Sequence, residues 1–245
     1  MIFLSIINLL FLYSQMIYDL KCLPFNYYEM DEDTKTRVHY YQNSVVDYIY
    51  VPPNETLMIK GNVLVKSFVL VNGFLIIDKG ANLIIDFQSN ENTNALILDY
   101  GTVINQGNII SSALYARNGS SLLYVYGGHK TNIVLIENFS TFSLYGSYIE
   151  AKEMILNKSI LCLGQKSKVV SCNMYFYNNI VGIVIIDEDY VYLDIKNKID
   201  IQSGILVANG NLRVKICKNF NINLHEYKFS YLCDIEYTHV CECIH

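Results

Sequence analysis

The strongest constraint on the fold is an asparagine that heads a short apolar run once every ten residues. Runs of this kind begin at Asn62, Asn72 and Asn82, Asn92 keeps the interval, and Asn108, Asn118 and Asn138 resume the spacing. Each run holds about five strand-forming residues and is followed by Gly, Asn or Ser, which tolerate the left-handed backbone angles of tight corners. Short, evenly spaced strands without a helical period predict an all-β fold built from repeats.

The composition supports strands and excludes two classes of protein. Hydrophobic residues make up 52% of the 245 residues and charged residues only 17%, which excludes a disordered chain. The net charge of -5 lacks the basic surface of a nucleic-acid binder, so we expect no nucleic-acid partner. All three prolines, Pro24, Pro52 and Pro53, lie near the start, and proline therefore interrupts no strand pairing after residue 53.

Two all-β architectures are compatible with the repeat. A sandwich or barrel needs hairpin turns, and the Asn-Gly pairs that begin at Asn72 and Asn118 suit them. A parallel β-helix stacks each coil on the last, so that a turn residue recurs at a fixed interval and its side chains form ladders. The fixed asparagine register favours the β-helix, with the sandwich as the alternative.

Two segments carry a resemblance to a known family. Residues 74–85, with Gly80 and Ala81 between two apolar runs, and residues 101–110 resemble the coils of right-handed parallel β-helices in surface adhesins. The resemblance implies about seven coils of roughly 22 residues each, stacked into a rod of roughly 34 Å. We accordingly divide the chain into residues 1–14 (signal peptide), 15–56 (N-terminal cap), 57–216 (single-stranded right-handed parallel β-helix) and 217–245 (cysteine-rich C-terminal cap).

The amino terminus predicts export. No charged residue precedes Asp19, and an apolar run through Leu12 ends at Ser14; a run of about 12 residues is typical of a signal-peptide core and is short for a membrane span. We expect cleavage near Ser14 and a secreted chain or one on the extracellular face of the plasma membrane. One alternative is an uncleaved anchor, and another is a buried first strand. We expect contact with a membrane only through such an anchor or through a further segment downstream.

The seven cysteines agree with an oxidising compartment, and four of them lie in the last 29 residues. The disulfide candidates are Cys162, Cys172, Cys217, Cys233, Cys241 and Cys243. The odd count leaves one thiol unpaired or bonded outside the chain. Cys162 and Cys172, ten residues apart, are expected at corresponding positions of successive strands, as a disulfide or as two buried thiols. His239 and His245 could join the last cysteines around zinc, but the spacing fits disulfides better.

Four Asn-x-Ser/Thr sequences are candidate glycosylation sites in an exported chain. They begin at Asn54, Asn118, Asn138 and Asn157. The alternative at each position is an unmodified loop asparagine.

Catalytic motifs are incomplete. Residues 92–94, 127–129 and 213–215 resemble three motifs of polygalacturonase-like hydrolases, but Asn94 stands in place of the first aspartate and the paired aspartates are missing. Glycoside hydrolysis normally needs two carboxylates. Asp187, Glu188 and Asp189 are interpreted as a polar corner closing a strand rather than a calcium site. We therefore predict no catalytic residue, no cofactor and no metal.

The function expected from these observations is contact. The 21 tyrosines can stack on sugar rings or form a protein interface, although tyrosine is also a common strand residue. We expect an exported, non-catalytic binding or structural ectodomain that meets a protein or glycan at the cell surface. Its layout is similar to the ectodomains of protist receptor-like proteins, of which it could form the N-terminal part. The alternatives are a pectin-lyase-like carbohydrate-active enzyme and a purely structural wall or coat component.

Overall fold

A computed structural model describes residues 38–85, 94–179, 182–185, 190–202, 206–208, 212–217, 233–238 and 243. Residues 36–245 belong to one compact unit. The described residues contain strands and no helix, and every strand pair among them is parallel. The expected β-solenoid is therefore confirmed, and the antiparallel sandwich is excluded.

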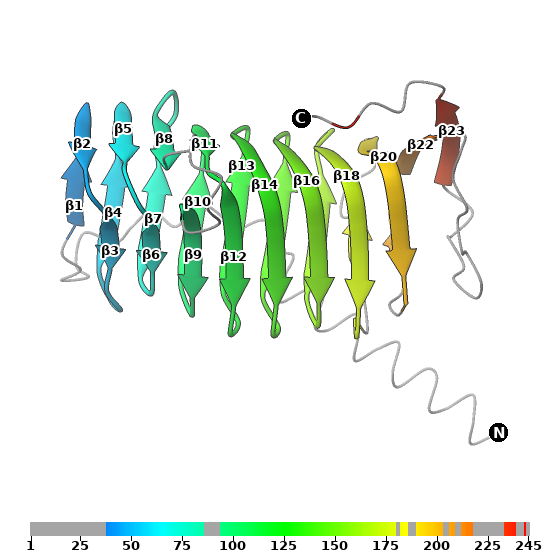
Figure 1. Ribbon diagram of the computed structural model, residues 1–245, viewed down its shortest axis with the longest axis horizontal. Helices are drawn as coiled ribbons and strands as arrows, with labels where there is room; N and C mark the ends of the chain where they lie inside the picture. The colour runs from blue at the N-terminus through cyan, green and yellow to red at the C-terminus, as the bar shows by residue number, and fades with distance from the viewer. Residues whose placement is uncertain are drawn as a thin grey trace, which may run out of the picture. The chain divides into compact units, whose positions relative to one another are not determined.

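The strands form three faces that run along the solenoid (Figure 1). The first face contains β1 (Val38–Tyr41), β4 (Thr56–Ile59), β7 (Phe74–Ile77), β10 (Thr102–Asn105), β13 (Ser121–Val125), β15 (Thr141–Tyr145), β17 (Ile160–Gly164), β19 (Ile183–Ile185) and β21 (Leu206–Ala208). The second contains β2 (Ser44–Val46), β5 (Asn62–Val65), β8 (Asn82–Ile85), β11 (Asn108–Ile110), the first halves of β14 (Gly128–Glu137), β16 (Tyr148–Asn157), β18 (Lys168–Tyr177) and β20 (Val191–Ile201), then β22 (Leu212–Cys217) and β23 (Cys233–Thr238). The third contains β3 (Ile49–Val51), β6 (Val69–Val71), β9 (Ala95–Asp99), β12 (Ala113–Arg117) and the second halves of β14, β16, β18 and β20.

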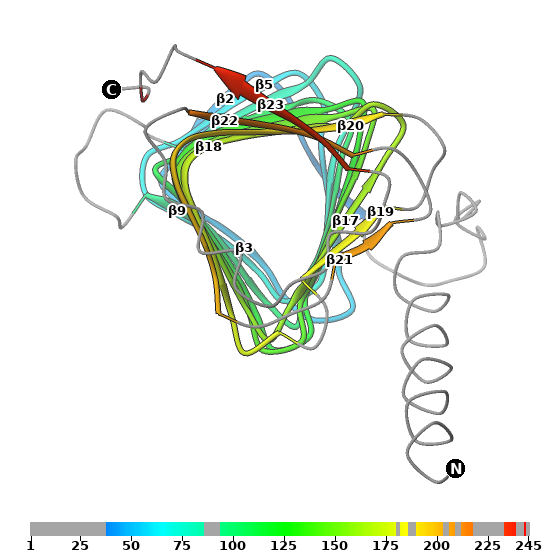
Figure 2. The same ribbon diagram turned by 90° about the vertical axis from the view of Figure 1, so that its right-hand side faces the viewer.

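The end view shows a triangular coil with the expected hand (Figure 2). The C-terminal rungs lie nearest the viewer, and the chain passes from the first face on the right to the second at the top and the third on the left. A chain that turns counterclockwise as it approaches the viewer is right-handed. The expected right-handed parallel β-helix is thus confirmed.

The ten-residue asparagine period is half of one rung. Asn62 pairs with Asn82 and Asn82 with Asn108, all at the corner between the first and second faces. Asn72 and Asn118 instead follow β6 and β12, at the corner between the third and first faces. One rung therefore takes about two periods, slightly fewer than the roughly 22 residues expected. Seven strands of the first face begin within residues 57–216, as the predicted seven coils require.

The paired strands begin earlier than residue 57. Val38 pairs with Thr56, Ser44 with Val63 and Ile49 with Val69. The first residue of each pair lies within residues 15–56. The sequence analysis assigned that segment to a cap because it lacks the asparagine rhythm. Its strand β3 nevertheless alternates buried and exposed positions as the later strand β5 does.

The interior is a stack of aliphatic side chains from successive rungs. Val63, Leu83 and Ile109 occupy one inward column, and each is at most 1% exposed. A single coil cannot bury its inward face, so each rung depends on the rungs above and below it. The hydrophobic cluster is continuous from Ile49 to Ile199.

Candidate functional site

A polar cluster interrupts the aliphatic interior at β13, β14 and the corner that follows β11. The His129 ring lies between Tyr124 and Ser111, with 2.7 Å from the Tyr124 hydroxyl to Nδ1 and 2.8 Å from Ser111 Oγ to Nε2. Ser111 Oγ also lies 3.0 Å from the Ala113 carbonyl and 3.4 Å from the Thr131 hydroxyl. The side chains of Tyr124, His129 and Ser111 are completely buried.

The cluster forms a directed chain of hydrogen bonds. A neutral histidine has one donor and one acceptor nitrogen. If Ser111 donates to the Ala113 carbonyl, its oxygen accepts from Nε2–H of His129, and Nδ1 then accepts from the Tyr124 hydroxyl. Every polar atom of the chain is satisfied by this single arrangement.

Burial keeps the cluster uncharged. It lowers the pKa of His129 from its usual 6.5 to about 3 and raises the pKa of Tyr124, because a charged ring in an apolar interior loses its hydration. A Ser–His pair can serve as nucleophile and base. This pair has a tyrosine instead of a carboxylate, and its side chains have no exposed surface to meet a substrate. The arrangement therefore supports the fold.

The three hydrolase-like segments do not converge. His129 points into the interior, and Asn94 is 7% exposed. Arg213 lies on the outer side of β22, where its guanidinium stacks over the Tyr190 ring at 4.1 Å. Its column passes from Gly128 through Tyr148, Lys168 and Tyr192, four strand spacings or roughly 19 Å from the β14 rung. Asn92, Thr93 and the carboxylates at 187–189 lie outside the described residues.

Surface carboxylates mostly have a basic partner nearby. The ion pairs of lysine and arginine among the described residues are Lys66–Asp47 (2.8 Å), Arg117–Asp99 (3.1 Å), Lys130–Glu150 (3.1 Å), Lys196–Asp194 (3.0 Å) and Lys198–Asp200 (3.2 Å). Among the described residues no group of three His, Cys, Asp or Glu side chains could hold a metal ion. The residues proposed for zinc at 239, 241 and 245 lie outside the described part.

The candidate glycosylation sites follow the corner geometry. Asn54, Asn118 and Asn138 adopt left-handed backbone angles between the third and first faces, and Asn157 ends β16 just before the same corner. The hydroxyl residues two positions later are buried: Thr56, Ser120, Ser140 and Ser159 are each at most 3% exposed. A corner that has an asparagine at the turn and a buried Ser or Thr two positions later therefore has the same spacing as a glycosylation sequence. The modification itself stays a prediction.

The cysteines are spread over different faces. Cys162 and Cys172 are buried on β17 and β18, but Cys162 pairs with Ser143 and Val184 on the first face, whereas Cys172 lies between the two halves of β18. They do not occupy corresponding positions, because a ten-residue interval is half a rung and moves to another face. Cys217 pairs with Thr238 and Cys233 with Leu212, so their Cα atoms lie roughly 16 Å apart along the ladder. Cys243 is half-buried, and Cys241 lies outside the described residues.

Some exposed tyrosines serve the fold. The Tyr148 ring covers Gly128 of the preceding rung so closely that a Cβ there would collide with the ring, and the Tyr126 ring covers Gly146 in the same way. At the first rung, Tyr40, Tyr41 and Tyr50 line an open depression of about 370 Å³ together with His39 and Glu55.

The outer side of the third face carries an unbroken apolar column, which the sequence reasoning missed. It consists of Tyr50, Leu70, Ile97, Tyr115, Leu135, Ile155 and Tyr175. All seven are at least partly exposed, and the column ends at Asp200. It spans about 29 Å at one strand spacing per rung. Its signal in the sequence is one apolar residue per rung, that is, at about every second asparagine period. This signal can be recognised only once the rung length is known.

The outer columns of the other faces differ. On the second face Val45, Leu64, Ile84 and Ile110 give way to Lys130 and Glu150. On the first face Met58, Ile76, Ile104 and Leu123 are followed by Ser143, Cys162 and Val184, which are at most 6% exposed. Among the described columns, the third face offers the longest apolar surface to a partner.

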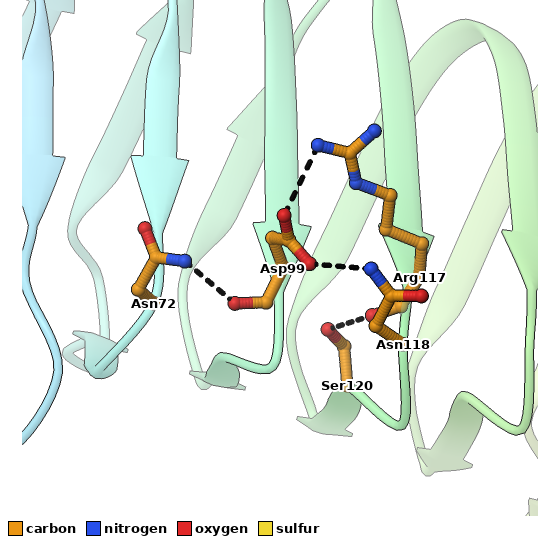
Figure 3. Close-up of polar contacts among 5 residues, drawn as sticks. All are labelled: Asn72, Asp99, Arg117, Asn118 and Ser120. Atoms are coloured by element: carbon orange, nitrogen blue, oxygen red, sulfur yellow. Dashed lines mark hydrogen bonds and ion pairs between the residues drawn. The ribbon is translucent and has the colours of Figure 1, made fainter.

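A polar rim borders this column at the corner with the first face (Figure 3). The Asp99 carboxylate accepts hydrogen bonds from Arg117 Nη2 at 3.1 Å and from Asn118 Nδ2 at 2.7 Å. Asn72 Nδ2 donates to the Asp99 carbonyl at 2.8 Å. Because Ala116 pairs with Ile136, Glu137 follows Arg117 along this rim. The rim therefore alternates acid, base and acid.

The geometry defines the class of protein, a parallel β-solenoid with a sealed interior and an apolar outer face. Comparison with protein-family models, with curated proteins and with solved structures found no match. A search of the described residues for a helix long and apolar enough to cross a membrane found none.

Proposed function

We propose that this chain is an exported, non-catalytic β-solenoid that works by surface contact, as a binding or structural ectodomain outside the cell or on its surface. The observation that carries the proposal is the apolar column of the third face, partly exposed over seven consecutive rungs. Contiguous apolar patches of this kind are uncommon on monomers and mark interaction sites. The apolar amino terminus and the seven cysteines support export.

Two further observations favour contact over chemistry. His129, whose two ring nitrogens each lie within hydrogen-bonding distance of a hydroxyl, is sealed in the interior, and five carboxylates pair with lysine or arginine. A glycosidase needs an acid whose pKa is raised and a second carboxylate across the bond. The partner class that we propose is a protein or a glycan at the cell surface, as expected from tyrosine and aliphatic side chains on a flat face.

The test is binding by the full chain exported from eukaryotic cells. We expect the chain in the medium or at the cell surface and retained on cells or on a glycan array. Leu135→Glu in the apolar column should abolish that retention, whereas Leu64→Glu on the second face, a matched exposed leucine, should leave it unchanged. Equal retention of both variants would refute the third face as the contact surface. Cleavage of pectin or another polysaccharide by the purified chain would replace the proposal with the enzyme alternative.

A further inference from the structure

We propose that the third face binds a second copy of this chain, forming a two-fold dimer. The inference rests on the proposed contact function and names one partner for it. Two features of the face point to a second copy: the apolar column has nearly the same chemistry read in either direction, and the charges of the rim complement one another across a two-fold axis.

The column is self-complementary. Its order is Tyr, Leu, Ile, Tyr, Leu, Ile, Tyr from β3 to β18. A two-fold axis parallel to the strands turns the solenoid end over end and keeps the strand direction, so the column of one chain lies against the column of its partner, apolar against apolar everywhere except at the two ends, where Tyr50 lies opposite the partner's Asp200. With the axis between β12 and β14, Tyr115 lies opposite the partner's Leu135 and Ile97 opposite the partner's Ile155. An isologous contact of this kind closes as a dimer and does not continue into a filament.

The rim selects the position of this axis. Arg117 pairs with Asp99 in its own chain, and the described ion pairs give Glu137 no basic partner. The axis between β12 and β14 sets each Arg117 against the partner's Glu137. It also sets each Asp99 against the partner's Asn157, whose amide can donate to the carboxylate. A shift by one rung would place Arg117 against the partner's Asp99 and leave both Glu137 side chains without a cation. Charge complementarity therefore fixes the register of the dimer.

The size of the face fits a weak, specific dimer. Eight strands at about 4.8 Å, each contributing about five residues of 3.3 Å, cover about 630 Å² per partner, or about 1,300 Å² in total. This area is at the small end of specific interfaces. We expect a dissociation constant in the micromolar range. A glycan on Asn157 would stand in the contact, so the dimer belongs to the chain with Asn157 unmodified.

The decisive experiment is a charge swap on the full chain freed of N-glycans, followed by analytical ultracentrifugation over a range of concentrations. Arg117→Glu should abolish self-association, since it sets two glutamates against two glutamates, and Glu137→Arg should do the same with arginines. Each like-charge contact should weaken the dimer more than about 100-fold. When the two variants are mixed, every facing pair is opposite in charge, and a heterodimer should form with close to wild-type affinity.

The controls separate this inference from the proposed function. Leu135→Glu should give a folded monomer, judged by circular dichroism, and Leu64→Glu should still dimerise. A wild-type chain that stays monomeric at all concentrations, or two charge variants that do not associate when mixed, would overturn the dimer. If Leu135→Glu nevertheless abolished retention on cells or glycans, the contact function would stand with a different partner.

Discussion

Two stretches of the interior hold their rungs together by different means. Between β5 and β11 the inward column consists of Val63, Leu83 and Ile109, which gain free energy from any apolar neighbour of suitable size. One rung later the same column carries His129, hydrogen-bonded to Tyr124 and Ser111. Those bonds form in only one register, because a shifted rung would leave the ring nitrogens without partners. The aliphatic rungs therefore supply stability, whereas the polar rung selects the alignment of the strands.

The largest expected effect is the loss of an aliphatic rung. Leu83→Ala removes a completely buried side chain and should cost about 2–5 kcal/mol of unfolding free energy through lost burial and the cavity left behind. Urea denaturation of both chains measures the change. Ile84→Ala, on the outer side of the same strand, is the matched control and should cost about 1 kcal/mol or less. Equal costs at the two positions would contradict the assigned inward face.

The polar rung should make the fold sensitive to acid. Burial lowers the pKa of His129 to about 3, whereas an unfolded histidine binds a proton near pH 6.5. Below pH 6.5 the unfolded chain binds more protons than the folded one, so His129 lowers stability by about 1.4 kcal/mol for each pH unit down to about pH 3.

Urea midpoints at neutral and acid pH measure this loss. Carboxylates also titrate in this window, and the control is therefore Ser111→Ala/Tyr124→Phe/His129→Leu, which replaces the polar rung with apolar side chains. The wild type should lose more stability than the triple variant. The same loss in both chains would show that His129 does not titrate as a buried neutral ring.

Replacing the whole cluster should cost less than the sum of its single substitutions. Tyr124→Phe leaves Nδ1 of His129 without its donor and should destabilise the chain by about 1–3 kcal/mol. The triple variant removes the unsatisfied partners as well and should cost less than the sum of its single substitutions. Additive costs in equilibrium unfolding would argue against a coupled network.

The smallest expected effect is at the exposed asparagine ladder. Asn82 donates to Asn62 Oδ1 at 2.7 Å and accepts from Asn108 Nδ2 at 3.1 Å. Asn82→Ala should cost about 0.5–1 kcal/mol, since water competes for these groups. Lys168→Ala lies in the same column beyond the ladder and should change the urea midpoint less. A loss of unfolding free energy in Asn82→Ala as large as that in Leu83→Ala would contradict the expectation that interior side chains contribute more stability than the exposed ladder.

Much of the fold was accessible from the sequence because the repeat imposes it. Asn62, Asn82 and Asn108 have the spacing of a ladder, and the alternation at residues 63–65 and 83–85 indicates which side chains face inward. The site was less accessible. Tyr124 and His129 belong to strands on two faces and Ser111 lies at the corner between β11 and β12, and nothing in their local sequence indicates that they meet. Their contact depends on the interior width of the triangle and on the exact rung length.

The sequence alone determined the all-β architecture and favoured the parallel coil, because strand propensity and corner residues act locally and repeat, while the number of coils followed from the resemblance to adhesin β-helices. Only the tertiary structure decided that one asparagine period is half a rung, that Val38 already lies in the ladder, and that Arg117 and Glu137 stand beside a seven-rung apolar column. These features depend on register, and a shift of one residue would exchange the inner and outer side chains of a strand. Local preference cannot specify that choice, whereas the burial of a whole stack of rungs does.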